Sequence, residues 1–372
     1  MTPHYARTIP LAQLEAELHA ARAERVVYWK DDGPLRLWCY TAKAVYDRAW
    51  APAVLAARGL VIDRELGQVV ATAFPKFFNV GELGQPVPDE PCEIFEKVDG
   101  SLIVIFHAGG RWRTATKGAL DSAQAKWAQA RLAAQDLSPL TPGTTYLAEA
   151  IYPENKIIIP YEETGLVMLA AYAADGLELD SVAVRATADA LGWRTAARQA
   201  FASPAAAIAH ADTLPKSAEG YVLRFASGLR LKAKGAAYRR LHAMISRVTP
   251  LGLWDATAAG DDLDGLRREI PEEFWWDFDE IRRLIEAELA ARVAAVAAAG
   301  AGLAALSDKE VGLRLPTLAE PVRRYVFAWR KRPDLLADAK SRQALLRDVK
   351  PRANELPGYR ASFAVQRLAE EE

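Results

Sequence analysis

A lysine that ends one apolar run and precedes another is the feature that most constrains what this chain can fold into. The run at residues 93–96 leads into Lys97-Val98-Asp99-Gly100, and a second apolar run occupies residues 102–106. Two apolar runs joined by turn residues predict a strand-turn-strand unit. A lysine in that place is partly withdrawn from water, which favours the neutral, nucleophilic amine. The alternative is an ordinary solvated lysine beside a turn, and the rest of the chain must decide between the two.

Composition limits the class of protein. The 372 residues are long for one domain and comfortable for two. No apolar run reaches the roughly 20 residues of a membrane span, and residues 1–5 have no signal-peptide pattern. Cys39 and Cys92 form neither a disulfide framework nor a metal-ligand spacing. We therefore expect a cytoplasmic protein without a membrane partner. With a net charge of −1, a polyanion would need a local basic groove.

The hydrophobic patterns predict an α+β domain at residues 1–245. Short β-like runs alternate with a few helical patterns, which is typical of antiparallel hairpins with flanking helices. Helices are predicted at residues 11–22, 123–134, 181–191 and 200–210. Strands are predicted at residues 26–30, 35–40, 59–63, 69–74, 112–116, 145–151, 157–159, 166–172, 221–225 and 229–233, besides the two runs around Lys97.

The pattern changes after about residue 245. Helical periodicity occupies residues 270–299, 318–329 and 334–346, and strand signals are nearly absent there. We predict a domain boundary near residues 240–255 and an all-α domain at residues 246–372. The glycines at 300–302 predict a loop that interrupts the alanine-rich stretch 291–305.

Charged residues recur beside the predicted strands of the first domain. Arg58 precedes an apolar run, Lys76 lies between a strand and a turn, and Lys117 follows a strand. Each has an ordinary interpretation as an exposed loop residue. Glu149 differs, because it lies inside the apolar run Ala-Glu-Ala-Ile and should face a cation there. Glu219 stands at the start of a predicted strand, and its ordinary interpretation is that of a turn residue.

Lys232 and Lys234 are the most informative pair. Residues two apart on a strand share a face, and two ammonium groups on one face repel each other unless an anion lies between them. A solvated sheet edge is the alternative to a bound phosphate. Together with the acidic residues, this inventory suits a nucleoside triphosphate and a divalent metal. The chain has neither a P-loop nor a protein-kinase signature set.

The order of these elements resembles the covalent nucleotidyltransferases, and within them the ATP-dependent RNA ligase 1 family of the T-even bacteriophage type. The resemblance covers roughly residues 55–240. Its Lys-Phe-Phe-Asn and Pro-x-Asn elements belong to the RNA ligase 1 type. DNA ligases and capping enzymes share the Lys97 motif and the two motifs that begin at Glu219 and Lys232. It is carried by Arg58-Gly59, Lys76-Phe77-Phe78-Asn79 with Gly81-Glu82, Lys97-Val98-Asp99-Gly100-Ser101, Thr116-Lys117-Gly118, Glu149 with Pro153-x-Asn155-x-Ile157, Glu219-Gly220-Tyr221-Val222, and Lys232-x-Lys234 with Tyr238.

This resemblance implies a ligase adenylation domain with antiparallel sheets and flanking helices. It also implies that Lys97 attacks the α-phosphate of ATP and carries lysyl-AMP. AMP then passes to an RNA 5′-phosphate, and a 3′-hydroxyl displaces it to seal the strand, so one hard step is divided into easier ones. We expect neighbouring cations to depress the pKa of Lys97.

The resemblance also assigns roles to the other residues. Glu149 and Glu219 would serve the ribose and a catalytic Mg²⁺ or Mn²⁺ ion. Lys232 and Lys234 would neutralise charge that develops at the α-phosphate. The remaining nucleotide-binding residues would be Arg58, Lys76 and Lys117 at phosphates, Asp99 and Gly100 in the turn, Leu169 and Val222 around adenine, and Phe78, Glu96 and Tyr238.

The implied partner is RNA with 5′-phosphate and 3′-hydroxyl ends, and an end-healing kinase or phosphatase could prepare those ends. Two alternatives remain: a DNA ligase or other polynucleotide adenylyltransferase with the same lysyl-AMP step, and a non-catalytic protein that binds RNA ends. The helical domain would select the RNA. Its basic stretches at residues 323–324, 330–332 and 340–347 could follow an RNA backbone, or form a solvated helix face.

Overall fold

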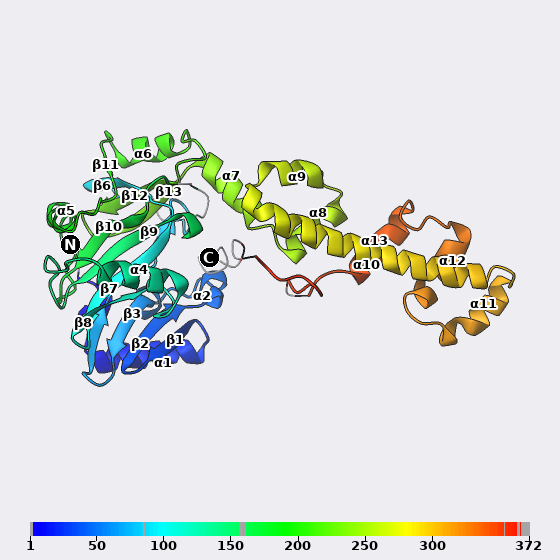
Figure 1. The fold of residues 1–372 in the computed structure, drawn as a ribbon, viewed down its shortest axis with the longest axis horizontal. Helices are drawn as coiled ribbons and strands as arrows, with labels where there is room; N and C mark the ends of the chain where they lie inside the picture. Colours follow the sequence, from blue (N-terminus) through cyan, green and yellow to red (C-terminus); the bar gives the residue numbers. More distant parts are fainter. Residues whose placement is uncertain are drawn as a thin grey trace. The chain divides into compact units, whose positions relative to one another are not determined.

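A computed structural model of the chain describes residues 3–84, 86–155, 159, 161–352, 354–362 and 365. The chain divides into two compact units, Met1–Arg240 and Leu241–Glu371. Figure 1 shows the sheets in the first unit and the helices of the second.

Three sheets form the first unit (Figure 1). The strand pairs are antiparallel except β13–β5, which is parallel. The first sheet has the order β1 (Val27–Asp32), β2 (Leu35–Tyr40), β3 (Arg58–Asp63) and β4 (Gln68–Ala71). The second has the order β10 (Gly165–Tyr172), β9 (Thr145–Ile151), β7 (Ser101–Ala108) and β8 (Arg111–Ala115). The third has the order β11 (Arg198–Gln199), β6 (Cys92–Glu96), β12 (Gly220–Phe225), β13 (Arg230–Lys234) and β5 (Phe78–Asn79).

The first two sheets share a core, and helices extend the cores of all three sheets. Val61 of β3 and Phe106 of β7 belong to one buried cluster between the first two sheets. Leu132 and Val184 extend the core of the second sheet into two of the helices, and Ala207 does so for the third sheet. The helices of this unit are α1 (Leu11–Ala23), α2 (Ala42–Tyr46), α3 (Pro52–Ala56), α4 (Ala123–Ala133), α5 (Ser181–Ala190) and α6 (Pro204–Ala211), with short 3₁₀ turns at Tyr5–Arg7 and Pro153–Asn155.

The predicted α+β class with antiparallel sheets is confirmed for this unit. Two predicted strands, β2 and β9, have the predicted bounds. The strand predicted at residues 69–74 is shorter in the structure, where β4 spans Gln68–Ala71. The strand predicted at residues 157–159 lies outside the described residues except for Ile159.

The described part of the second unit contains helices and one isolated bridge, Arg352–Glu355, but no strand. The long helix α10 packs against α12 and also contacts α8 and α13 (Figure 1). The indole N–H of Trp254 donates to the carbonyl of Leu346 at 2.8 Å, which ties α8 to α13. The helices are α7 (Ala236–Ile245), which contains the division between the units, α8 (Pro250–Ala259), α9 (Leu263–Glu269), α10 (Trp275–Gly302), α11 (Asp308–Arg314), α12 (Val322–Lys331) and α13 (Ala339–Asp348), with 3₁₀ turns at Glu272–Phe274 and Leu315–Thr317.

The predicted loop at residues 300–302 is wrong, since α10 continues to Gly302. A Cβ atom on Gly300 would lie 2.3 Å from Cε3 of Trp329, a residue of α12. Glycine therefore serves here for close helix approach rather than for a turn. No helix among the described residues is both long and apolar enough to cross a membrane.

Candidate active site

The sheet pairing of β6 with β12 brings the predicted nucleophile beside a buried carboxylate. Lys97 follows β6 and donates its backbone N–H to the carbonyl of Gly220 at 2.8 Å. Glu219 immediately precedes β12, and its Oε2 lies 2.6 Å from Nζ of Lys97. On the other side, Lys234 is in register with Gly220, and its Nζ lies 3.0 Å from Oε1 of Glu219. One carboxylate thus joins two ammonium groups from different strands.

This arrangement sets the protonation of Lys97 and of its carboxylate partner, Glu219. Burial would favour the neutral acid, but Lys97 and Lys234 outweigh it and lower the pKa of Glu219. Burial likewise disfavours the Lys97 ammonium, but Glu219 and Glu149 outweigh it and raise the pKa of Lys97 above its ordinary value. The expectation that neighbouring cations depress the pKa of Lys97 is therefore wrong for this state, because its nearest charged partner is an anion.

A second wall of the site comes from β9 and the turn after Lys97. The backbone N–H of Gly100 donates to Glu149 Oε1 at 3.2 Å. A Cβ atom on Gly100 would lie 2.4 Å from the carbonyl oxygen of Ala150, so the close approach requires glycine. Burial raises the pKa of Glu149 to about 7, with Lys97 opposing the shift. The carboxylate is consequently shared between its charged and neutral forms near neutral pH.

Asp99 is held from three directions. Tyr238 donates its hydroxyl to Oδ1 at 2.9 Å, and the backbone N–H of Ile159 donates to Oδ2 at 3.0 Å. The backbone N–H of Asp99 itself donates to the hydroxyl of Tyr161 at 2.8 Å. Burial and the charge of Glu219 raise the pKa of Asp99 to about 6. Asp99 therefore fixes the turn that presents Lys97.

Three further cations gather nearby without a carboxylate partner among the described residues: Arg58, Lys76 and Lys232. Burial and the charges of Lys97 and Lys76 lower the pKa of Lys232 well below its ordinary value. Burial and Arg58 also lower the pKa of Lys76. One buried guanidinium nitrogen of Arg58, Nη1, has no hydrogen-bond partner among the described residues. Mutually repelling, desolvated cations form a site that an anion would stabilise.

Aromatic rings support two of these cations. Nζ of Lys232 lies 4.7 Å from the ring centroid of Phe77. Nζ of Lys76 lies 5.4–5.7 Å from the centroids of the Tyr40, Trp50 and Phe78 rings. Aromatic faces attract cations without neutralising them. Both lysines therefore keep a fixed place without a carboxylate that would compete with an anionic ligand.

The remaining predicted residues lie at the edges of this cluster. Glu96 forms an ion pair with Arg194 at 2.6 Å and accepts the backbone N–H of Ala197 at 3.0 Å. The backbone of Lys117 lies close to Gly59, where a Cβ atom would be 3.4 Å from Cα of Lys117. The other three positions are Leu169 in the bulge of β10, the half-buried Val222 of β12, and Ile157, which lies outside the described residues.

The donor set fits a divalent metal held jointly with a ligand. No group of three His, Cys, Asp or Glu side chains in the described part of the chain could hold a metal ion by itself. Glu149 and Glu219 are buried carboxylates of one electrostatically coupled cluster, and the raised pKa of Glu149 means that its burial is not fully compensated by cations. Mg²⁺ usually takes one or two carboxylates and completes its shell with waters and phosphates. These two residues fit that mode of binding.

Sequence reasoning missed several residues of the site. Tyr161 and the pair Tyr40 and Trp50 were not singled out, because nothing local marks an aromatic residue that reaches a distant cation or turn. Asn155 was quoted only as part of a motif. It joins the end of β9 to the turn, since it donates to the Ala150 carbonyl at 2.7 Å and accepts from the Ser101 hydroxyl at 3.0 Å.

The basic stretches of the second unit are largely paired within that unit. Arg323 pairs with Glu320, Arg324 with Asp348, and Arg332 with Asp338. Arg330 pairs with a carboxylate and also donates to the carbonyls of residues 303 and 306 at 2.9 and 2.7 Å, near the C-terminus of α10. These contacts favour the interpretation of a charged helix face.

Comparisons with known proteins agree with this geometry. Residues 56–238 match the model of a family described as RNA ligase. RNA ligase 1 of Bacteriophage TS2126 is 30% identical over 175 residues, which cover 42% of this chain and 44% of the relative. The RNA ligase of Rhodothermus phage RM378 is 22% identical over 206 residues, which cover 43% of this chain and 46% of the relative. The matched part thus spans less than half the length of either relative.

The fold is similar to that of a solved RNA ligase structure. An archaeal ATP-dependent RNA ligase has a TM-score of 0.50 at 17% identity, covering 75% of this chain and 83% of its own. This likeness concerns the fold alone. The family match covers the segment that contains Arg58, Lys97, Glu219 and Lys234, which the structure brings into one domain. Residues 56–238, just under half of the chain, thus match the RNA ligase family.

Proposed function

We propose that this protein is an ATP-dependent RNA ligase that seals 5′-phosphate and 3′-hydroxyl RNA ends. The observation that carries the proposal is the joint presence of a buried lysine–carboxylate pair, Lys97 and Glu219, and a separate group of cations without carboxylate partners among the described residues. The first supplies a nucleophile, and the second suits a polyphosphate.

In the proposed reaction, Nζ of Lys97 attacks the α-phosphorus of ATP, and the bond to the β-phosphate oxygen breaks. A nitrogen–phosphorus bond forms, pyrophosphate leaves, and lysyl-AMP remains. Lys232, with Lys76 and Arg58, would bind phosphate oxygens and stabilise the charge on the leaving group. Asp99 and Gly100 hold the turn so that Lys97 keeps its direction of attack. AMP then passes to the RNA 5′-phosphate, and the 3′-hydroxyl displaces it.

The proposal includes a divalent cation, Mg²⁺ or Mn²⁺, at Glu149 and Glu219. When bound, such an ion would neutralise phosphate charge. The carboxylates themselves orient the site: Glu219 holds Lys97 and Lys234, and Glu149 accepts from Gly100. Leu169 and Val222 would enclose the adenine, and Lys117 would contact a phosphate. Phe78 would support Lys76, and Glu96 would hold the end of β6.

We also propose that residues 246–372 form an all-helical domain that selects the RNA. The helices of the described part support this proposal. A kinase or phosphatase that prepares the ends, and a cytoplasmic location, remain predictions.

Label transfer from α-labelled ATP tests the proposal. Protein stripped of bound AMP with pyrophosphate is incubated with labelled ATP or GTP and a divalent metal, then denatured. We expect label from ATP to stay on the wild-type chain and on Lys43→Ala, which changes an exposed lysine paired with Asp47. Lys97→Ala should take up none. If the stripped wild-type protein takes up no label, the ligase function is refuted and an RNA-end binder becomes the better interpretation.

A sealing assay then chooses the polynucleotide. Labelled protein is mixed with single-stranded RNA or DNA of the same sequence that carries a 5′-phosphate and a 3′-hydroxyl. We expect adenylylated and circular RNA in preference to the DNA products. Preferential sealing of DNA would instead support the DNA ligase alternative.

A further inference from the structure

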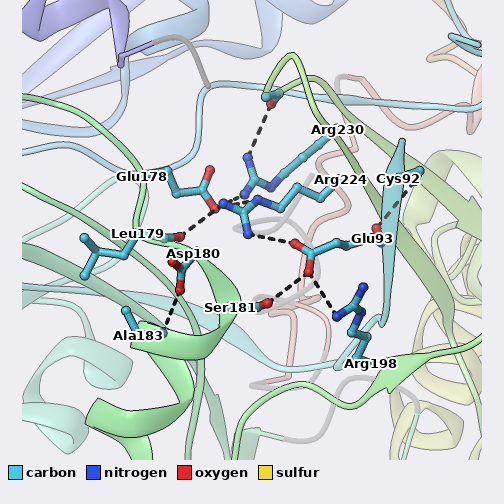
Figure 2. Close-up of polar contacts among 11 residues, drawn as sticks. Cys92, Glu93, Glu178, Leu179, Asp180, Ser181, Ala183, Arg198, Arg224 and Arg230 are labelled. Atoms are coloured by element: carbon cyan, nitrogen blue, oxygen red, sulfur yellow. Dashed lines mark hydrogen bonds and ion pairs between the residues drawn. The ribbon is translucent and has the colours of Figure 1, made fainter. Parts of the chain in front are cut away.

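Two buried arginines face each other at one end of the β12–β13 hairpin. Arg224 and Arg230 are in register on adjacent strands and are 6% and 7% exposed. Like charges directly opposite each other on a sheet repel. Glu178, from the segment between β10 and α5, lies between them: its Oε1 is 3.1 Å from Nε of Arg224 and also pairs with Arg230 (Figure 2).

A second carboxylate extends this cluster to the strand that leads to Lys97. Glu93 of β6 accepts from Nη1 of Arg224 at 3.1 Å and from the Ser181 hydroxyl at 2.9 Å (Figure 2). Arg224 also donates to the carbonyl of Leu179 at 3.1 Å. This end of the hairpin is thus attached to β6 and to the chain before α5.

Arg230 lies on the same strand face as Lys232 and Lys234, because side chains two apart on a strand point the same way. The outer two of these cations have carboxylate partners, Glu178 and Glu219. Lys232, between them, has none among the described residues. Its position therefore depends on the strand and on the neighbouring Phe77 ring.

A short row of contacts connects Arg230 to that ring. The guanidinium carbon of Arg230 lies 4.5 Å from the centroid of Phe74. Phe74 meets Phe77 edge to face, with centroids 6.0 Å apart and an interplanar angle of 85°. Nζ of Lys232 then lies 4.7 Å from the Phe77 centroid. The planar guanidinium, fixed by Glu178, gives Phe74 a rigid neighbour on one side.

We propose that Arg230, held by Glu178, is a positioning residue for Lys232 and acts through Phe74 and Phe77. This inference rests on the proposed function, in which Lys232 binds phosphate oxygens during lysyl-AMP formation. A displaced phosphate-binding group lowers the rate of the chemical step, and a shift of about 1 Å can cost up to roughly a hundredfold. The arginine itself need not touch the nucleotide.

Two variants separate the links of this row. Arg230→Met removes the guanidinium but keeps an unbranched chain, and Phe74→Leu removes the connecting ring but leaves Arg230 and Glu178 in place. We expect each to lower the single-turnover rate of lysyl-AMP formation about tenfold, with the KM for ATP within about twofold. The double variant should be no slower than the slower single variant, because both changes break the same row of contacts.

Leu132→Ala is the control for lost stability. Leu132 is 1% exposed in α4 and belongs to a core cluster that contains neither Phe74 nor Arg230. Its labelling rate should stay near wild type at a temperature where all variants are folded by circular dichroism. If Arg230→Met does not fold, Phe74→Leu alone still decides.

The outcomes are distinct. A wild-type protein that takes up no label refutes the ligase function, and the positioning role falls with it. A wild-type protein that labels normally, with Phe74→Leu equally fast, refutes only the positioning role. A Leu132→Ala rate that falls as far as the Phe74→Leu rate also refutes it, because general destabilisation would then explain the loss.

Discussion

The buried imidazole of His4 should make the first unit sensitive to acid. His4 is 3% exposed, and its Nδ1 accepts the backbone N–H of Ala6 at 3.2 Å. Its ring meets Tyr172 edge to face at 5.6 Å. Burial, together with the charge of Arg7, lowers the pKa of His4 from 6.5 to about 4. As the pH falls, the folded protein therefore binds this proton later than the unfolded chain does.

The sign and the size of the effect follow from linkage. The unfolded state binds more protons between the two pKa values, so stability is fully present above pH 6.5 and is lost as the pH falls towards 4. At pH 4.5 the unfolded imidazole is almost wholly charged and the folded one mainly neutral. The difference corresponds to a loss of about 2.5 kcal/mol in the free energy of unfolding.

His4→Asn tests this value. Asparagine can still accept the Ala6 N–H at this N-cap position, but it cannot gain a proton. Urea unfolding at pH 7 and pH 4.5 gives each protein's loss of stability on acidification. Carboxylates contribute equally to both proteins, so the difference between the two losses isolates His4. We expect wild type to lose about 2.5 kcal/mol more than the variant.

An exposed residue without a titratable group provides the control. Val182→Ala, at a 77% exposed position, should lose as much stability as wild type between the two pH values. Equal losses for wild type and His4→Asn would refute the reasoning, because the imidazole would then titrate alike in both states. A lower stability of His4→Asn at pH 7 would not count against it, since the smaller side chain leaves a cavity at either pH.

Three further substitutions give predictions of different kinds. Glu219→Gln leaves two ammonium groups without their carboxylate and should cost about 3–5 kcal/mol in urea unfolding; unchanged stability would contradict the pairing. Trp50→Leu removes one ring from the surroundings of Lys76 and should raise the KM for ATP in the labelling assay about two- to fivefold; an unchanged KM would remove Lys76 or the ring from nucleotide binding. Gly220→Ala should destabilise by more than about 3 kcal/mol, because φ is +140° and a Cβ atom would lie 2.1 Å from a carbonyl oxygen of β13; Gly33→Ala, at φ +57° with open space around it, should lose only about 1–2 kcal/mol.

The sequence pattern alone was enough to predict the bounds of strands that are buried along nearly their whole length. Residues 35–40 and 145–151 were predicted with the observed bounds, because mainly apolar runs flanked by turn residues leave little choice of ends. The placement of Lys232 and Lys234 on one face also followed from strand periodicity. Among the described residues, Lys234 pairs with Glu219 and Lys232 has no carboxylate partner; a phosphate between the two lysines stays a prediction.

The remainder of the site depends on contacts between distant residues. Lys97 and Glu219 are separated by 122 positions, and only the β6–β12 pairing brings them together. Trp50 lies beside Lys76 although a strand pair separates them in the chain, and Tyr161 reaches the backbone of Asp99 across 62 positions. Such contacts leave no periodic trace, so sequence reasoning could name the charged residues but not their aromatic supports. For the same reason it gave the pKa of Lys97 the wrong direction.

The balance of charge distinguishes the lysines that are paired with a carboxylate from those that are not. Glu219 neutralises part of the charge on Lys97 and Lys234, while Arg58, Lys76 and Lys232 have no carboxylate partner within the described residues. An entering polyphosphate would be attracted more strongly to the second group than to the first, because Glu219 already offsets part of the charge of the first. The proposed nucleophile therefore differs from the proposed phosphate-binding groups in having a carboxylate partner. The ion pair with Glu219 also has a disadvantage. It raises the pKa of Lys97 and so favours the ammonium form, which is not nucleophilic. Under the proposed function, attack by Lys97 would require its contact with Glu219 to weaken, so that contact would couple nucleotide binding to reactivity.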